Sequence, residues 1–130
     1  MEDVSFSYRA KEEIISKINS KPKADVCMMG MLTYCNCLSD DEISFLTENK
    51  AVADFFVLNT GRITGNENAV LVTEQKKRNG VVLYALDIPE REDRLTLLDY
   101  FRMDKSRRLE EADLPKEKFY PQLVAGIFLA

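Results

Sequence analysis

Three cysteines are the residues of this chain whose chemistry is most versatile, at positions Cys27, Cys35 and Cys37. A structural zinc site takes four cysteine or histidine ligands, commonly in closely spaced pairs, and a nucleophilic cysteine needs a neighbouring base. The chain has no histidine, no C-x-x-C motif and no fourth cysteine. We therefore interpret the cysteines as small apolar core residues and predict no metal, no cofactor and no catalytic thiol.

Two adjacent acids, Asp40 and Asp41, are the next candidates, because carboxylate oxygens are the ligands that Mg²⁺ prefers. They lie in a short polar stretch between two predicted strands, where acids are normally solvated. A phosphate-binding loop is also unsupported, since Gly61 and Gly65 are not followed by the Lys and Ser or Thr that such a loop needs. Neither feature predicts a phosphate or metal site.

A basic cluster, Lys76, Lys77 and Arg78, precedes Asn79 and Gly80 at a predicted hairpin turn. Such a cluster can contact phosphates, and it can equally be an ordinary solvated turn. The formal net charge of −4 argues against a free-standing, tight nucleic-acid binder, because phosphate binding is driven by clustered Lys and Arg.

The 130 residues, 45% apolar and 31% charged, are typical of one globular domain. No apolar run is long enough to span a membrane. The acidic N-terminus lacks a secretory signal, and the odd cysteine count fits a reducing compartment, so we expect a cytoplasmic protein. The sequence ends inside an apolar helical pattern, which is expected of a shortened chain.

Apolar periodicity and turn residues predict the elements that position these groups. The first helix spans residues 7–18, the second 23–34, and a short hairpin pairs 35–38 with 43–47. Asn49 is the expected cap of a third helix through Leu58, with Gly61 and Gly65 marking its exit. A second hairpin pairs residues 69–73 with 81–86.

A fourth helix is expected to begin at Asp87 and Pro89 and to bury the residues Leu95, Leu97, Leu98 and Phe101. A charged connection then leads to a last helix that begins near Pro121. The predicted order is therefore α-α-β-β-α-β-β-α-α.

Two apolar segments, residues 26–36 and 123–130, align on single glycines, Gly30 and Gly126. Glycine within a helix costs roughly 1 kcal/mol relative to alanine, so a matched pair suggests a packing role. Without a Cβ, two helix backbones can approach closely. The alternative is that both are ordinary core helices with incidental glycines.

The repeated segment resembles the LAGLIDADG helix of the homing-endonuclease fold. Its second copy, residues 126–130, resembles the G-A-F-L-A segment of the WhiA family of bacterial regulators of sporulation and cell division. The opening, residues 5–14, is similar to that family's S-F-S-x-x-V-K-x-E-L, and residues 47–53 are similar to its T-E-N-x-A-V-A.

The resemblance implies an α+β fold, namely a LAGLIDADG-like module of order α-β-β-α-β-β-α preceded by an N-terminal helix. Residues 1–22 are then the leading helical region, 23–120 one LAGLIDADG-like repeat, and 121–130 the start of a truncated second repeat. It also implies that Gly30 faces Gly126 within one chain. A homodimer is expected to cover the apolar surface that remains bare.

In an active LAGLIDADG endonuclease, an acid at the end of each motif helix holds the metal that activates water. The matching position here is Cys35, and the motif's other aspartate position is Thr33. Neither is a hard oxygen ligand, so the resemblance implies a domain that is not an enzyme.

WhiA proteins join this module to a C-terminal helix-turn-helix domain, and the LAGLIDADG sheet forms a saddle over DNA. The resemblance therefore implies weak DNA contacts by Lys76, Lys77 and Arg78, or protein contacts, while a helix-turn-helix domain outside this sequence supplies most DNA affinity. The alternative is a stand-alone protein-interaction or oligomerisation domain without nucleic-acid binding.

Overall fold

The computed structural model describes residues 6–33, 35, 37–101, 127 and 129. Over this part the protein is a mixed α+β structure with an antiparallel sheet in the order β1-β2-β4-β3. Its elements are α1 (Phe6–Ser16), α2 (Lys21–Thr33), β1 (Cys37–Leu38), β2 (Ile43–Thr47), α3 (Lys50–Thr64), β3 (Leu71–Lys76), β4 (Val82–Asp87) and α4 (Arg91–Tyr100). The predicted class and the predicted order of these elements are confirmed. The last predicted helix, with Gly126, lies outside the described residues except for Ile127 and Leu129, which are helical.

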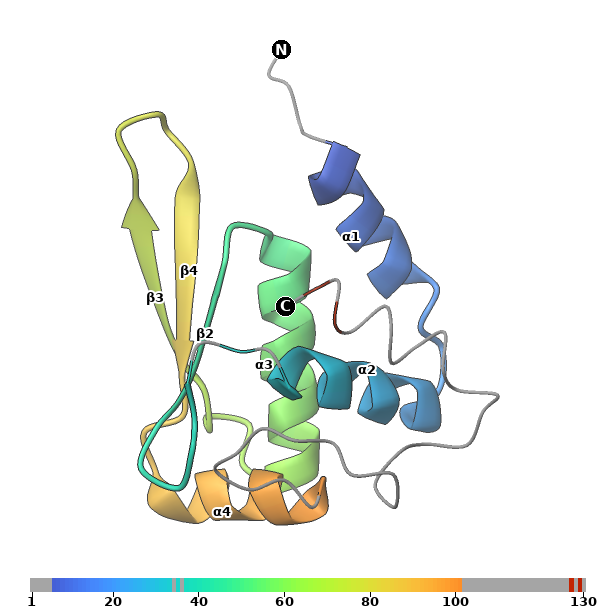
Figure 1. The fold of residues 1–130 in the computed structure, drawn as a ribbon, viewed down its shortest axis with the longest axis vertical. Helices are drawn as coiled ribbons and strands as arrows, with labels where there is room; N and C mark the ends of the chain where they lie inside the picture. The colour runs from blue at the N-terminus through green and yellow to red at the C-terminus, as the bar shows by residue number, and fades with distance from the viewer. Residues whose placement is uncertain (1–5, 34, 36, 102–126, 128, 130) are drawn as a thin grey trace.

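The helix α3 is the centre of the molecule and packs against α1, α2, α4 and two strands (Figure 1). Asn49 caps it as predicted, since its side chain accepts hydrogen bonds from the N–H groups of Ala51 and Val52 at 3.0 and 3.3 Å. The predicted end at Leu58 is wrong, because the helix continues to Thr64. It ends at Gly65, whose φ of 75° is the left-handed conformation that glycine favours.

Gly61 therefore lies inside α3 and does not mark its exit. A Cβ at this position would meet the Cα of Glu67 at 3.2 Å. The missing side chain lets the segment after the helix fold back closely against it, which offsets the low helix propensity of glycine.

The core lies between the sheet and the helices. Met28, Met31 and Leu32 of α2 are fully buried in it. The ring of Phe45 in β2 stacks on that of Phe56 in α3, with centroids 5.2 Å apart and an interplanar angle of 9°. This contact joins the sheet to the central helix.

Three predicted details are wrong. Asp87 is the last residue of β4, paired with Ser44 and Leu71, so α4 begins only at Arg91. Sheet pairing overrides the local helix signal there. Leu95, predicted to be buried, is 39% exposed, and the first strand, predicted over 35–38, is shortened to Cys37–Leu38.

In the described part, no helix combines the length and apolar character needed to cross a bilayer.

Candidate functional site

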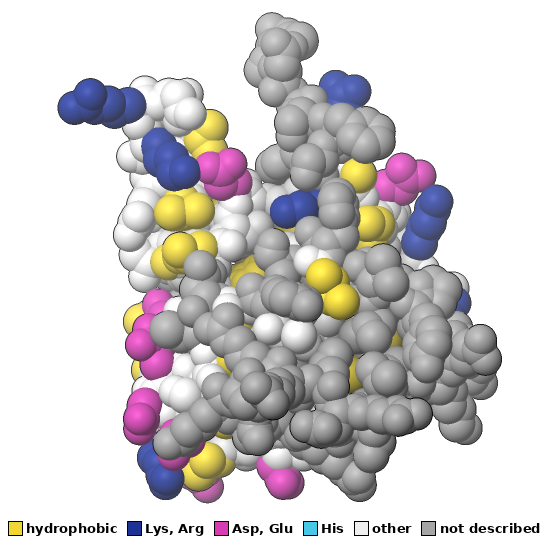
Figure 2. Space-filling view, viewed as in Figure 1, with side chains coloured by type: hydrophobic (Ala, Val, Ile, Leu, Met, Phe, Trp, Pro, Cys, Tyr) yellow, Lys and Arg dark blue, Asp and Glu magenta, His cyan; other side chains and the backbone are white. Residues whose placement is uncertain are grey.

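The basic cluster lies at the tip of the β3–β4 hairpin, which projects beyond the body of the molecule (Figure 1). The N–H of Lys77 donates to the carbonyl oxygen of Val81 at 2.8 Å, and that of Gly80 donates to the carbonyl oxygen of Lys77 at 3.0 Å. Gly80 has a φ of 83°, so the turn closes with a residue in the left-handed region. The predicted turn is confirmed, and Figure 2 shows basic side chains at this tip.

The three cations of the tip differ in their surroundings. The ammonium of Lys77 forms a half-exposed ion pair with the carboxylate of Glu48, with Nζ and Oε2 2.8 Å apart. Lys76 and Arg78 are exposed. A local acid therefore offsets one of the three charges, which weakens the field that the tip can present to a phosphate.

The open face of the sheet is a feature that the sequence patterns did not single out. Side chains alternate between the faces of a strand, and Phe45 and Leu86 point into the core. The positions between them point away from the helices, and the strand register groups them into one surface. This open face consists of Ser44, Leu46, Leu71, Thr73, Gln75, Leu83, Ala85 and Asp87.

Half of the residues on the open face are apolar, and Asp87 is its one charged residue. Leu46 and Leu71 are 43% and 57% exposed. Leu46 lies directly across from Ala85, which lies directly across from Thr73. None of the eight strand positions on this face is Lys or Arg. Figure 2 shows apolar side chains along the hairpin below its basic tip. Such a surface favours contact with protein over contact with phosphates.

The positions that the resemblance matches to catalytic acids, Thr33 and Cys35, lie at the end of α2 and just after it. The hydroxyl of Thr33 donates to the carbonyl oxygen of Met29 at 2.8 Å, and Cys35 is 1% exposed. Both side chains are thus turned to the interior. In the ranges that the structure describes, no three residues among Cys, His, Asp and Glu form a group that can hold a metal ion.

Asp40 contributes to the fold at its turn. Its carbonyl oxygen accepts a hydrogen bond from Nε of Arg94 at 2.8 Å, and its carboxylate lies 3.7 Å from the guanidinium of Arg91. Both partners belong to α4, so this turn fixes the start of that helix. A metal role for Asp40 would compete with these contacts.

Cys27 is fully buried, and burial raises the pKa of its thiol to about 12. The protonated thiol is a poor nucleophile and a poor metal ligand. Its environment is that of a core residue.

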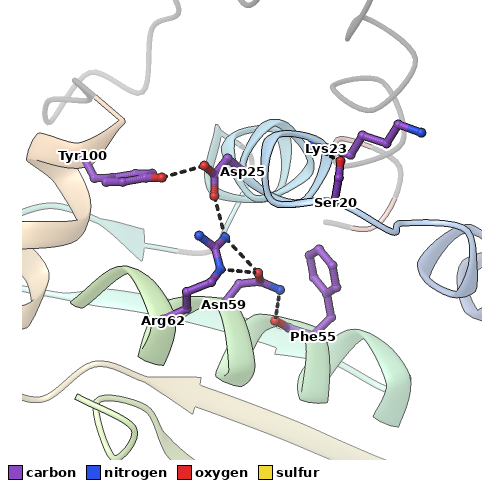
Figure 3. A network of polar contacts seen from close by, with 7 residues as sticks. All are labelled: Ser20, Lys23, Asp25, Phe55, Asn59, Arg62 and Tyr100. Atoms are coloured by element: carbon purple, nitrogen blue, oxygen red, sulfur yellow. Dashed lines mark hydrogen bonds and ion pairs between the residues drawn. The ribbon is translucent and has the colours of Figure 1, made fainter. Parts of the chain in front are cut away.

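A network of four side chains, which the sequence patterns did not predict, connects three helices (Figure 3). The guanidinium of Arg62 in α3 and the hydroxyl of Tyr100 in α4 each donate to the carboxylate of Asp25 in α2, both at 2.5 Å. Arg62 also donates to Oδ1 of Asn59 at 3.0 and 3.2 Å, and Asn59 donates to the carbonyl oxygen of Phe55 at 2.9 Å. In the sequence, the only local indication of this network is Asp25, a single acid within a largely apolar helix.

The electrostatics of this network follow from Asp25. Burial of the Arg62 guanidinium lowers its pKa, but the hydrogen bond and charge of Asp25 outweigh burial and hold the pKa above its usual value. The hydrogen bond to Asp25, followed by burial, raises the pKa of Tyr100. Because the donors and acceptors bind one another, we interpret this cluster as a structural clamp.

A groove borders the clamp between α1, α2 and α3. Ile15, Ile18 and Phe55 line it together with Leu58, which is 71% exposed. Arg62 also reaches this groove, but its guanidinium is directed to Asp25 and Asn59. The groove therefore offers apolar contact area rather than an assembled set of reacting groups.

The predicted contact of Gly30 with Gly126 concerns a residue outside the described part of the chain. Gly30 itself is buried in α2. Leu129 is fully buried in the same hydrophobic core as Met28 and Met31. Ile127, which the sequence predicts to be covered, is 38% exposed, so the described end of the chain is only partly covered. The glycine pairing stays a prediction.

Comparison of this chain with family models, curated proteins and solved structures finds no match in any of the three.

Proposed function

We propose that this chain is the non-catalytic N-terminal domain of a WhiA-like transcriptional regulator of sporulation or cell division, and that it works in the cytoplasm through protein contacts. DNA contact by this domain is weak and confined to Lys76, Lys77 and Arg78 at the hairpin tip. A helix-turn-helix domain outside this sequence supplies the sequence-specific affinity.

Support for a LAGLIDADG-like module comes from the order of the elements. From α2 to α4 the chain runs α-β-β-α-β-β-α, with α1 as an additional leading helix. This is the arrangement that the resemblance implies. The segment from Thr47 to Ala53, which is similar to the T-E-N-x-A-V-A motif, has a structural role in this chain, because its Asn49 caps the central helix α3.

Support for a non-catalytic role comes from Thr33 and Cys35, which occupy the positions of the metal-binding acids. A hydroxyl that is bonded within its own helix and a buried thiol cannot replace carboxylates as ligands for Mg²⁺. Incubation with supercoiled plasmid and Mg²⁺ or Mn²⁺ is expected to leave the plasmid intact. Cleavage that persists through repurification and through Asp40→Ala and Asp41→Ala controls would overturn this part of the proposal.

The observation that carries the choice of protein contact is the open face of the sheet. A saddle that binds DNA needs cations over its surface, because affinity for the duplex arises from phosphate neutralisation. The open face instead presents Leu46, Leu71 and Leu83, with Asp87 as its one charged strand residue. This composition suits an apolar partner surface.

The proposal can be tested by grafting this chain onto the helix-turn-helix domain of a WhiA regulator in a sporulating bacterium that lacks its own copy. We expect the chimera to restore sporulation. The double variant Leu46→Glu and Leu83→Glu should abolish this activity, because it places two carboxylates on the open face.

The matched control reverses the charge of Lys76, Lys77 and Arg78 together. This triple variant should retain most activity and lose only the weak, salt-sensitive binding of the isolated domain to duplex DNA. If the triple variant loses sporulation and the open-face variant keeps it, the roles that we assign to the hairpin tip and to the open face are wrong.

A stand-alone interaction or oligomerisation domain is the second candidate, favoured by the same open face and by the net charge of −4. It requires no helix-turn-helix domain. In that case the chimera has no activity, while the isolated domain still binds its protein partner.

A further inference from the structure

We propose that a second copy of this chain binds along the free edge of β3, so that the two sheets join into one continuous antiparallel sheet. The inference does not depend on the proposed function, because it rests on backbone geometry and on the distribution of charge along the hairpin.

β3 is an exposed edge strand whose protection is limited to two charged residues, Glu74 and Lys76, which have opposite signs. It stands at the end of the order β1-β2-β4-β3, and all six of its residues are exposed. In Figure 1 no helix of the described part lies beyond it. Natural edges are commonly blocked by proline, by a bulge or by inward charges. β3 contains no proline, its pairing with β4 is continuous, and Leu71 and Val72 are 57% and 42% exposed.

The hydrogen-bond phase of β3 decides which of its residues can bond outward. In an antiparallel pair, residues whose N–H and C=O point to the partner alternate with residues whose groups point away. Lys77 donates to Val81 at 2.8 Å and is thus bonded toward β4. By alternation Gln75 and Thr73 also bond toward β4, and the N–H and C=O of Val72, Glu74 and Lys76 point to the free edge.

This alternation limits the strand registers that a symmetric dimer can adopt. Outward-bonding residues must oppose one another, so the two-fold axis has to place one residue of β3 opposite its own copy. Three residues near the middle of the strand qualify: Thr73, Glu74 and Gln75. Registers with the axis between two residues are excluded.

The side chains choose among these three registers. Centring on Glu74 places two carboxylates directly opposite each other, which is unfavourable. Centring on Gln75 sets Glu74 opposite Lys76 of the other copy, but it leaves the first half of β3 opposite the turn and so pairs the fewest residues of the strand. Centring on Thr73 pairs most of the strand, sets Val72 opposite Glu74, and opposes no like charges. We therefore assign the register centred on Thr73.

The charges at the two ends of the hairpin fit a second copy. The tip carries Lys76, Lys77 and Arg78, while acids lie at the base, among them the exposed Glu67 and Asp87 at the end of β4. Figure 2 shows the basic tip above and acidic side chains below it. Antiparallel pairing brings the tip of each copy alongside the base of the other, so the two surfaces are complementary in charge.

The register is tested by two substitutions at one site. Val72→Lys places a cation opposite Glu74 of the other copy, and Val72→Glu places a second carboxylate there. Both remove the same exposed side chain, so their effects on the monomer are matched. Sedimentation velocity over a range of concentrations and salt should show a dimer that salt weakens. It should be tightened by Val72→Lys and weakened by Val72→Glu, by about tenfold in dissociation constant between the two variants.

Cross-linking gives an independent readout. With Cys37→Ser as background, the remaining cysteines are Cys27 and Cys35, which are buried. In the assigned register, two Thr73→Cys residues form a pair without mutual hydrogen bonds, with Cα atoms about 4.5 Å apart, which is within disulfide range. Gln75→Cys is the control, because its copies are offset by roughly 13 Å along the strands.

We expect a disulfide dimer for Thr73→Cys and none for Gln75→Cys. A protein that is monomeric at every concentration would overturn the proposal. So would a dimer that responds equally to Val72→Lys and Val72→Glu, or one that cross-links through Gln75→Cys, since such a dimer uses another register or another surface. None of these results depends on DNA or on sporulation, so failure here is distinct from failure of the proposed function.

Discussion

Removing the carboxylate of Asp25 tests the clamp that joins α2, α3 and α4. In Asp25→Ala, the guanidinium of Arg62 loses its carboxylate partner and the hydroxyl of Tyr100 loses its acceptor. The two residues of this ion pair are 37 positions apart in sequence and belong to different helices. The substitution therefore removes a tertiary contact and leaves each helix with its own local interactions.

The magnitude follows from the burial of the pair. The side chains of Asp25 and Arg62 are 24% and 25% exposed. Exposed pairs contribute about 0–1 kcal/mol, and removal of one partner from a fully buried pair costs about 3–5 kcal/mol. A pair that is mostly but not fully buried falls between these limits, so we expect Asp25→Ala to lower the free energy of unfolding by about 2 kcal/mol. For a domain of this size the melting temperature should fall by roughly 6–8 °C.

Urea denaturation followed by circular dichroism measures this change, and a double-mutant cycle isolates the pair. Because Arg62→Ala removes the same contact, the double variant should be less destabilised than the sum of the single variants, by about 1–2 kcal/mol. The control is the exposed pair Lys50 and Asp54, which lies within one turn of α3 and whose removal should leave the midpoint unchanged. Additive single variants, or equal effects at both pairs, would refute the reasoning.

Three further outcomes are expected. Thr60 is fully buried, and its hydroxyl has no hydrogen-bond partner in the described part of the chain. Thr60→Val should therefore raise the free energy of unfolding by about 1 kcal/mol in the same urea assay. A loss of stability would mean that the hydroxyl is bonded. Gly30 is buried in α2, so Gly30→Leu should destabilise by roughly 1–3 kcal/mol through overpacking, and an unchanged denaturant midpoint would contradict a close approach there. Burial raises the pKa of Cys27 from 9.0 to about 12, so its contribution to stability is present below pH 9 and is lost as the pH rises toward 12. Unfolding measured across this range should be less dependent on pH in Cys27→Ala, and identical slopes would show that the thiol ionises alike in both states.

Local signals in the sequence determined most of the elements. Asn49 predicted the start of α3 because a cap acts only on the N–H groups that follow it. The Lys-Lys-Arg-Asn-Gly sequence predicts the turn, because glycine readily adopts the positive φ that Gly80 has there. The same local character explains two errors. Gly61 resembles a helix end in sequence, and Asp87 with Pro89 resembles a helix start, but contacts with Glu67 and with the sheet override both signals.

Only the tertiary structure decided which residues share a surface. Leu46, Leu71 and Leu83 come from three different strands, and the register places them on one open face. Asp25 and Tyr100 are 75 residues apart and meet because α2 and α4 both pack beside α3. The order of the strands made β3 an edge, with its outward N–H and C=O groups unpaired by β4. Sequence patterns report the neighbours of a residue along the chain, whereas a surface, an ion pair between helices and a sheet edge depend on distances that folding alone establishes.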